Sequence, residues 1–548
     1  MVKKPNGKTE QERVQVFDFA DPENNHFLAI KELKIHGELY RRRTDIVGFV
    51  NGIPLLFVEL KNHNVDVQDA YTCNYTDYLD TIPHLFYYNA FLMLSNGSEA
   101  KVGTLGSKYE FFHEWKRLKE DEEGSVALET MLRGICNKRN FMDLFENFIL
   151  YDHSGGRTAK ILARNHQYLG VNEAVEVYKQ RKLRNGRLGV FWHTQGSGKT
   201  ALAFHNVRYL RDYYQKQGKI AKFYFIVDRL DLLEQAKSEF VARGLIVRTA
   251  NSRDELMEDF RRNVVVSNAS GKPEIMVVNI HKFKEDHSKV EISGNYSTKL
   301  QRVFFIDEAH RGYSPQGSFL ANLLEADKDA IKIALTGTPL IKDERASWRV
   351  FGDYIDKYYY DKSIADGYTL KLMREDIETS YREKIEDVLR SLAGDVEVKK
   401  SDIDRHKIIE HENYLNSLLD YIIDDLRKFR IQMADKSVAG MIVCETNPQA
   451  RAMMALFSER FPDPEAPGAL KAVLILHDEG DKLERKDSID EYKKRETIDL
   501  LIVNKMLLTG FDAARLKKLY LGRKLDGHDL LQALTRVNRP YKNFKYGY

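Results

Sequence analysis

Three side chains near the start of the chain, Asp45, Glu59 and Lys61, have the types and the spacing that cutting a phosphodiester requires. Asp45 and Glu59 stand near opposite ends of the stretch TDIVGFVNGIPLLFVELK (44–61), and Lys61 follows Glu59 by two positions. Two carboxylates can hold a divalent cation such as Mg²⁺, and a nearby ammonium can steady the attacking water and the developing charge. The spacing therefore predicts a catalytic site of these three residues, with Asp45 and Glu59 as Mg²⁺ ligands.

The elements that must hold these groups are two apolar strands joined by Asn51-Gly52, a dipeptide that favours a two-residue hairpin turn. A strict turn of this kind sets Asp45 opposite Val58, so that Asp45 and Glu59 point to different faces. We therefore expect a three-residue turn or a one-residue bulge. Either would shift the pairing by one residue and set Asp45 opposite Glu59.

A second chemical pattern, HTQGSGKT (193–200), follows the apolar run LGVFW and precedes a helical pattern. Glycines let a backbone approach phosphate oxygens, and a helix N-terminus offers N–H donors to them. The usual phosphate loop begins with glycine, whereas this chain has His193. We predict ATP binding, with Lys199 on the β- and γ-phosphates and Thr200 on Mg²⁺. The predicted ATP-binding residues of this loop are Gln195, Gly196, Ser197, Gly198, Lys199 and Thr200.

Two further carboxylates end the buried-strand pattern VFFIDEAH (303–310). A pair at the carboxyl end of a strand, about a hundred residues after a phosphate loop, suits nucleotide hydrolysis. We expect Asp307 to hold the Mg²⁺ of the nucleotide and Glu308 to activate the attacking water.

Bulk composition fits a soluble protein of several domains and names no function. The 548 residues are 43% hydrophobic and 30% charged. No apolar stretch reaches the roughly 18 residues of a membrane-spanning helix, and no signal-peptide pattern occurs, so we expect a cytoplasmic protein without a membrane partner. Three scattered cysteines fit neither a zinc site nor a disulfide framework. The net charge of +3 neither requires nor excludes nucleic acid. Basic clusters at 41–43 and 181–187 could either bind DNA or face solvent.

The order of apolar runs predicts three domains of the α/β class. Strand and helix patterns fill residues 1–150, and from about residue 187 short apolar runs alternate with helices, as in parallel sheets with crossover connections. We divide the chain into an N-terminal module (1–150), a first doubly wound lobe (151–345), and a connector with a second such lobe (346–548).

Seven stretches, in this order, resemble the motifs of superfamily 2 helicases and translocases: QGSGKT, FIVDRLDLLEQ, DEAH, ALTGTPL, MIVCETNPQA, LLTGFDAARL and QALTRVNR. The resemblance implies two RecA-like lobes with ATP between them. It implies that Gln532, Arg536 and Arg539 act on the nucleotide, either arginine being the one that reaches the transferred phosphoryl group. Gln167 is either the glutamine that reads adenine or an ordinary surface residue. The resemblance also implies residues that couple the nucleotide to DNA: Arg229, Thr336, Thr338, Thr509 and Asp512.

The stretch RRRTDIVGFVNGIPLLFVELKN also resembles the nuclease segment of the restriction (R) subunit of type I restriction-modification enzymes. This resemblance implies a PD-(D/E)xK endonuclease-like domain ahead of the motor. That family often carries a Gln-x-x-x-Tyr element after the hairpin, and here the nearest match is Asn74 with Tyr78. Because asparagine replaces glutamine, we expect no catalytic role for Asn74, whereas Tyr78 could contact DNA.

The same resemblance implies ATP-dependent translocation on double-stranded DNA, Mg²⁺-dependent cleavage, and partner methyltransferase (M) and specificity (S) subunits. R subunits continue into a helical assembly region that this chain is expected to lack. Two alternatives stay open. One is a stand-alone repair or defence helicase-nuclease, which would not co-purify with M and S subunits. The other is an ATP-dependent DNA-binding module whose N-terminal domain is inactive, which would not nick DNA.

Overall fold

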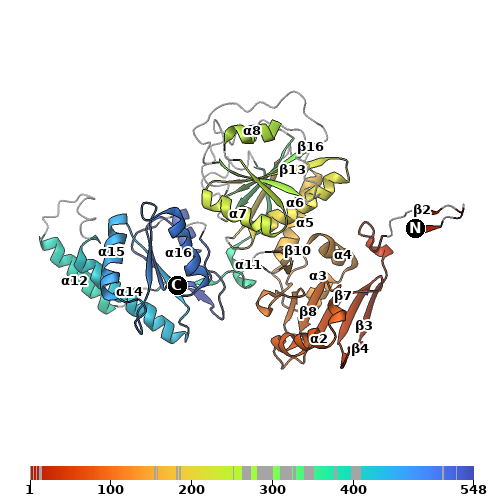
Figure 1. Ribbon diagram of the computed structural model, residues 1–548, viewed down its shortest axis with the longest axis horizontal. Coiled ribbons are helices and arrows are strands. Elements are labelled where there is room, and N and C mark those ends of the chain that lie inside the picture. Colours follow the sequence, from red (N-terminus) through yellow and green to blue (C-terminus); the bar gives the residue numbers. More distant parts are fainter. Residues whose placement is uncertain are drawn as a thin grey trace. The chain divides into compact units, whose positions relative to one another are not determined.

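The computed structural model (Figure 1) describes most of the chain, with gaps near the N-terminus and in several internal segments. The described residues are 2–3, 5, 7, 9–10, 15–153, 156, 158–180, 183, 187–194, 196–250, 252–261, 273–280, 300–308, 324, 327, 329–337, 351–375, 379–395, 409–508, 511–525 and 527–548. Three predicted site residues, Gln195, Thr338 and Thr509, lie outside them. The chain divides into two units, 1–194 with 198–359, and 195–197 with 360–548.

Unit 1 begins with a mixed sheet of five strands in the order β3-β6-β7-β8-β9. Its central strands β7 and β8 are parallel, and its other neighbours are antiparallel. Because both central strands are buried along most of their length, a carboxylate near the end of β7 enters a largely apolar environment. The strands are β3 (Phe27–Lys31), β6 (Ile46–Val50), β7 (Ile53–Leu60), β8 (Phe91–Ser95) and β9 (Ala100–Gly103).

Helices cover both faces of this sheet. Successive residues of a strand point to opposite faces, so each strand contributes side chains to both helical layers. Phe57 and Leu92 pack toward one helical layer, and Val58 and Met93 pack toward the other. The first layer consists of α1 (Val67–Asp69), the π-helix η2 (Ala70–Tyr75), α2 (Thr76–Thr81) and η3 (Pro83–Phe86). The second consists of α3 (Leu128–Ile135) and α4 (Lys138–Asn147).

The β6–β7 hairpin contains the expected one-residue bulge. Next to the turn, Val50 pairs with Ile53 and Phe49 with Pro54, but Gly48 pairs with Leu56, so the register shifts by one residue. The shifted register continues to Ile46 opposite Val58, and one step further it sets Asp45 opposite Glu59. The predicted shift is confirmed, and of the two devices considered the chain uses the bulge.

A small second hairpin lies between β3 and β6. Its strands are β4 (Lys34–His36) and β5 (Arg41–Arg43), which pair antiparallel. Shorter elements elsewhere in this part are β1 (Val2–Lys3), β2 (Thr9–Glu10), η1 (Pro22–Asn24), η4 (Tyr109–Phe111), and the antiparallel pair β10 (Ile149–Asp152) and β11 (Ala159–Leu162).

The rest of unit 1 is a seven-stranded parallel sheet in the order β14-β15-β13-β16-β17-β12-β18. Two apolar cores occupy its two faces, one against α5, α6 and α7 and the other against α8 (Figure 1). The strands are β12 (Arg187–His193), β13 (Ile220–Val227), β14 (Ile246–Thr249), β15 (Glu274–Asn279), β16 (Leu300–Asp307), β17 (Ile331–Thr336) and β18 (Tyr354–Tyr358). The helices are α5 (Asn165–Lys179), α6 (Lys199–Gln215), α7 (Leu230–Ala242) and α8 (Arg253–Arg261).

Unit 2 contains a four-stranded parallel sheet in the order β21-β22-β20-β23. Helices α14 and α15 pack on one face, and α16 and α17 pack on the other. The elements are β20 (Ala439–Val443), β21 (Ala472–Ile475), β22 (Leu500–Val503), β23 (Leu516–Leu521), α11 (Tyr360–Ala365), α12 (Thr379–Asp395), α14 (Glu412–Gln432), α15 (Asn447–Arg460), α16 (Lys482–Lys494), α17 (Gly527–Leu534) and the short parallel pair β19 (Lys371–Leu372) and β24 (Tyr546–Gly547).

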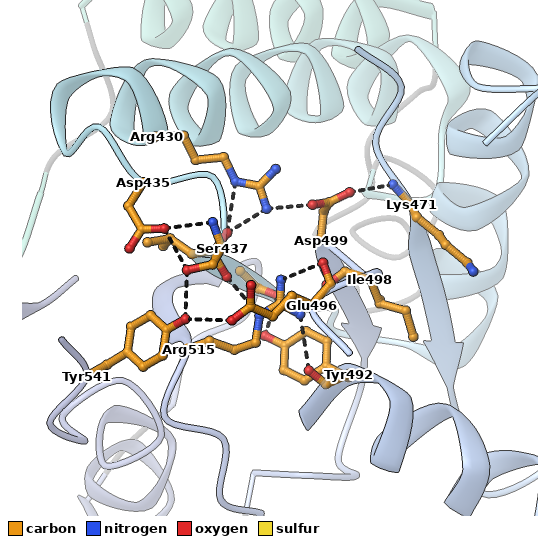
Figure 2. A network of polar contacts seen from close by, with 12 residues as sticks. Arg430, Asp435, Ser437, Lys471, Tyr492, Glu496, Ile498, Asp499, Arg515 and Tyr541 are labelled. Atoms are coloured by element: carbon orange, nitrogen blue, oxygen red, sulfur yellow. Dashed lines mark hydrogen bonds and ion pairs between the residues drawn. The ribbon is translucent and has the colours of Figure 1, made fainter. Parts of the chain in front are cut away.

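Buried polar contacts hold the amino ends of these strands together (Figure 2). The guanidinium of Arg515, only 2% exposed, donates to the backbone carbonyls of Ser437 at 2.8 Å and Ile498 at 2.7 Å. Arg430 pairs with Asp499 at 2.5 Å, and Asp499 also accepts from the backbone N–H of Lys471 at 2.7 Å. These contacts satisfy backbone groups that would otherwise be buried without partners.

The seven-stranded sheet of unit 1 and the four-stranded sheet of unit 2 are both parallel and covered on two faces. Together with the five-stranded mixed sheet, they confirm the predicted α/β class, with two RecA-like lobes after the N-terminal domain. The expected boundary at 345/346 falls among residues that are not described, and β18, which follows it, pairs with β12 of the first lobe. Within the described part of the chain, no helix is long and apolar enough to cross a membrane.

Candidate functional site

The three predicted nuclease residues come together at the carboxyl end of β7. The carboxylate of Asp45 accepts a hydrogen bond from the backbone N–H of Leu60 at 2.7 Å, which ties it beside its cross-strand neighbour Glu59. The ammonium of Lys61 lies 3.3 Å from Oε1 of Glu59. Glu59 and Lys61 share one face of the strand because they are two residues apart. The bulge and this spacing thus place two carboxylates and one ammonium together.

Glu59 is held in an electrostatically unusual state. Its side chain is almost completely buried, and its Oε2 atom has no hydrogen-bond partner among the described residues. Burial and, second, the negative charge of Asp45 raise the pKa of Glu59 to about 7, while Lys61 works in the opposite direction. A buried carboxylate oxygen without a donor, next to a second carboxylate, suits a hard cation that prefers oxygen ligands. The residues present therefore fit a Mg²⁺ ion.

The helical layer above β7 adds two residues to this cluster. Nζ of Lys61 donates to Oδ1 of Asn74 at 2.5 Å, so Asn74, from which no catalytic role was expected, contacts the proposed catalytic lysine. Tyr78 lies close enough to Asn74, Glu59 and Asp45 for each to shift the pKa of its hydroxyl, although burial is the largest cause of the upward shift. Asn74 belongs to the π-helix η2, and such turns occur often at functional sites.

The nucleotide-site residues of unit 1 gather at the carboxyl edge of its sheet. Strands β12, β17 and β16 are neighbours. Thr336 and Asp307 are the last residues of β17 and β16, and the phosphate loop starts at the end of β12, so all three lie at adjacent strand ends. Glu308 comes next in the chain, with a positive φ of 49°. Arg229 precedes α7 at the end of neighbouring β13. The parallel topology therefore assembles residues that are far apart in the sequence.

Lys199 and Asp307 interact across this edge. Burial raises the pKa of Asp307, the nearby carboxylate of Glu308 raises it further, and the ammonium of Lys199 lowers it. A divalent cation at Asp307 would favour the ionised carboxylate, as Lys199 does. The acidic pair and the lysine thus fit a Mg²⁺–nucleotide.

The phosphate loop forms the turn between β12 and α6, and two of its glycines adopt left-handed backbone. Gly196 and Gly198 have φ values of 88° and 90°, and Gly198 directly precedes Lys199 and Thr200 in the first turn of α6. This is the geometry for which glycine is favoured. Ser197 lies between the two glycines.

Gln167 is part of the loop's support. Its amide nitrogen donates to the carbonyl oxygen of Gly198 at 3.3 Å, and its amide oxygen accepts from the backbone N–H of Arg164 at 3.0 Å. The side chain is 5% exposed, which excludes the alternative of an ordinary surface glutamine. Whether it also reads adenine stays a prediction.

His193, which stands where a phosphate loop usually begins with glycine, has a buried partner. Its Nε2 atom lies 2.6 Å from Oδ2 of Asp356 on β18, and both side chains are at most 1% exposed. Asp356 in turn packs against Gly170 of α5, where an added Cβ atom would lie 2.6 Å from its carboxylate oxygen. Sequence reasoning missed Asp356, because 163 residues separate it from His193.

The predicted residues of unit 2 form two separate sets of contacts. Arg539 pairs with Asp512, with Nε and Oδ1 3.1 Å apart. Arg536, on the other hand, donates to the backbone carbonyls of Phe511 and Gln532, with Nε 3.1 Å from the latter oxygen. Gln532 lies buried in α17. The guanidinium of Arg536 is thus bound to the backbone of its own lobe.

Three family models match the chain in succession. They are described as the type I restriction enzyme R protein N terminus over residues 2–111, the SWI2/SNF2 ATPase over 166–404, and the type I restriction enzyme subunit R domain 3 over 479–548. The chain is related to the R proteins of type I restriction enzymes. The R-protein N terminus precedes the ATPase, as the resemblance implied, and the three matches together confirm the recognition.

The individual relatives that the chain matches are also subunits of type I restriction enzymes. The chain is 29% identical to the type I restriction enzyme HindI endonuclease subunit of Haemophilus influenzae over 98% of its own length and 54% of that protein. It is 26% identical to the SauMRSORF196P endonuclease subunit of Staphylococcus aureus over 95% of its length and 58% of that protein. The chain thus spans about half the length of the curated relatives it matches. A solved HsdR-subunit fragment from Vibrio vulnificus YJ016 aligns over 94% of this chain and 86% of that one, at 17% identity and a TM-score of 0.43.

Proposed function

We propose that this chain is the motor and nuclease portion of a type I restriction endonuclease subunit, which moves along double-stranded DNA by hydrolysing ATP and cuts it with Mg²⁺. The observation that carries the proposal is the bulge in β6–β7, which sets Asp45 opposite Glu59 and beside Lys61, ahead of a phosphate-loop ATPase. A hairpin serving only as core would have no need of two carboxylates and an ammonium at one end.

In the nuclease site, we assign Asp45 and Glu59 to a Mg²⁺ ion, which when bound would polarise the phosphodiester and favour an attacking hydroxide. Lys61 would stabilise negative charge on the scissile phosphate, and Asn74 would orient Lys61 through the 2.5 Å contact. Glu59 would have to lose its proton before it could bind a cation. Within the described residues no group of three or more His, Cys, Asp or Glu side chains is arranged for a metal, and the proposed nuclease site accordingly rests on the pair Asp45 and Glu59.

In the motor, we assign Lys199, Thr200 and Asp307 to the Mg²⁺–ATP complex and Glu308 to orienting the attacking water. Gln195, Gly196, Ser197 and Gly198 would line the phosphates. Of the two arginines of the last motif, we propose Arg539 for the phosphoryl group, because Arg536 already donates to two carbonyls of its own lobe. The coupling roles of Arg229, Thr336, Thr338, Thr509 and Asp512 stay part of the proposal.

The partners are proposals too: the relatives' names describe subunits of type I restriction enzymes, and the family resemblance implies M and S subunits as partners in restriction-modification defence. We propose that the nuclease covers residues 1–150, that the first motor lobe runs from 151 to 359 because β18 pairs with β12, and that the connector with the second lobe covers 360–548.

Two variants of the full-length subunit, assembled with its M and S subunits, test both assignments. Lys61→Ala should leave ATP hydrolysis unchanged and lower cleavage of circular DNA by about 10²–10⁴-fold. Lys199→Ala should abolish ATP hydrolysis, because phosphate binding loses its cation.

Full ATP hydrolysis and full cleavage by both variants would overturn the site assignments. If the wild type hydrolysed ATP but did not cut DNA, the chain would instead be an ATP-dependent DNA-binding module. A subunit that cuts DNA and never co-purifies with M and S would indicate a stand-alone helicase-nuclease.

A further inference from the structure

The β4–β5 hairpin has an exposed face made of basic side chains and one histidine. Its register sets Lys34 opposite Arg43 and His36 opposite Arg41, and directly opposite residues of an antiparallel pair share one face. All four side chains are exposed, whereas Ile35 and Arg42, on the other face, are half-buried. We call Lys34, His36, Arg41 and Arg43 the hairpin face.

This arrangement is unfavourable in the chain by itself. Like charges directly across a strand pair repel, and here the Lys34 ammonium faces the Arg43 guanidinium, with Arg41 next to them opposite His36. Among the described residues, this face forms one ion pair, between Arg43 and Glu32 at 3.6 Å. Its side chains are 62% and 63% exposed, so it contributes little. A row of closely spaced anions would relieve the repulsion.

The hairpin is held rigidly on the nuclease domain by its other face. Arg42 makes a two-pronged contact with Asp77 of α2, at 2.6 and 2.9 Å. Gly37, at the hairpin turn, lies so close to α2 that an added Cβ atom would be 2.0 Å from the carbonyl oxygen of Thr81. The hydroxyl of Tyr78 donates to the carbonyl oxygen of Arg43 at 3.1 Å. The basic face therefore has a defined position.

That position is next to the proposed cutting site. Only Thr44 separates β5 from Asp45, and the carbonyl oxygen of Asp45 accepts from the backbone N–H of Glu32 at 2.8 Å, at the start of the hairpin. Tyr78, which contacts Arg43, also lies within electrostatic reach of Asp45 and Glu59. An anion bound by the hairpin face would thus lie close to the scissile bond.

We propose that the hairpin face binds the phosphates of duplex DNA beside the scissile bond and so holds the strand against Asp45, Glu59 and Lys61. The inference rests on the proposed nuclease function and names the surface by which that site holds its substrate. Several exposed cations on one face of a strand pair suit the closely spaced phosphates of a duplex, and such contacts are independent of sequence.

The test is the salt dependence of DNA binding by the full-length subunit. The double variant Lys34→Ala/Arg41→Ala removes one cation from each cross-strand pair and keeps Arg42 and its contact with Asp77. With a fluorescent 30-base-pair duplex as probe, the slope of log affinity against log salt should become shallower by about 1.8, or about 0.9 for each phosphate that the hairpin face no longer neutralises. Cleavage should fall, while the rate of ATP hydrolysis stays unchanged.

Two controls separate charge from folding. Arg133→Ala removes an exposed arginine from α3, which covers the opposite face of the sheet, and should leave the slope unchanged. Lys34→Arg/Arg41→Lys keeps both charges and should preserve the slope and cleavage.

A double alanine variant with the wild-type slope and wild-type affinity would overturn the inference, and so would loss of M and S binding at an unchanged slope, because the hairpin would then dock a protein. In either case, loss of cleavage in Lys61→Ala would leave the nuclease proposal standing. Full cleavage by Lys61→Ala would contradict the nuclease proposal itself.

Discussion

At the scale of single residues, Glu59 decides when the proposed nuclease can work. It is buried, faces Asp45, and has Lys61 as its one cationic neighbour among the described contacts. Its pKa of about 7 means that a sizeable fraction carries a proton at neutral pH. Because a protonated carboxyl cannot hold Mg²⁺, proton loss and cation binding should be linked.

We expect cleavage at limiting Mg²⁺ to rise with pH through about pH 7 and then to level off, about tenfold per pH unit on the acidic side. Higher Mg²⁺ should move the midpoint to lower pH, because the cation favours the ionised carboxylate. Single-turnover cleavage per ATP hydrolysed is the quantity to measure, since Asp307 of the motor also has a raised pKa. Cleavage independent of pH between about 6 and 8 at limiting Mg²⁺ would contradict this account.

At the scale of elements, the start of the phosphate loop depends on how closely α5 approaches β18. Gly170 allows the approach, Asp356 fills the space beside it, and His193 bonds to Asp356. The same helix carries Gln167, whose side chain contacts the carbonyl of Gly198. The packing of one helix on one edge strand thus positions the loop from two directions.

Gly170→Ala should therefore weaken nucleotide binding and lower stability. Its Cβ atom would lie 2.6 Å from Oδ2 of Asp356, and crowding of this kind in a packed core costs about 1–3 kcal/mol. Glu173→Ala, on the exposed side of α5, is the matched control and should leave both properties unchanged. Nucleotide affinity by calorimetry and thermal unfolding check the pair. Wild-type values for Gly170→Ala would show that α5 does not position the loop.

At the scale of the whole molecule, unit 1 and unit 2 each have apolar cores, and in unit 2 buried polar contacts also join segments at the amino ends of the strands. Arg515 donates to the carbonyls of Ser437, Tyr492 and Ile498, which lie before β20, in α16 and before β22. One buried side chain thus joins three segments that are distant in the sequence (Figure 2).

Arg515→Met should destabilise unit 2 by at least about 3 kcal/mol, because each carbonyl left buried without a donor costs about 1–3 kcal/mol. Hydrogen exchange of the amides of β20 and β23 measures this locally. Arg451→Met, which removes a half-exposed arginine paired with Asp478 and Glu479, should change protection by less than about 1 kcal/mol. Equal protection in the two variants would refute the role given to Arg515.

The sequence by itself determined which groups are available for chemistry and in what order. Strand alternation, the glycines of HTQGSGKT and the acidic end of β16 are local patterns, and local backbone preferences suffice to interpret them. The need for a register shift could also be worked out, because a two-residue turn and the spacing from Asp45 to Glu59 are incompatible without one.

Only the tertiary structure decided the choice of a bulge, the raised pKa of Glu59, the contact between Lys61 and Asn74, and the pairing of His193 with Asp356. Each depends on burial or on elements brought together from distant parts of the chain. No local pattern encodes such distances, because they arise only when separate helices and strands share a core.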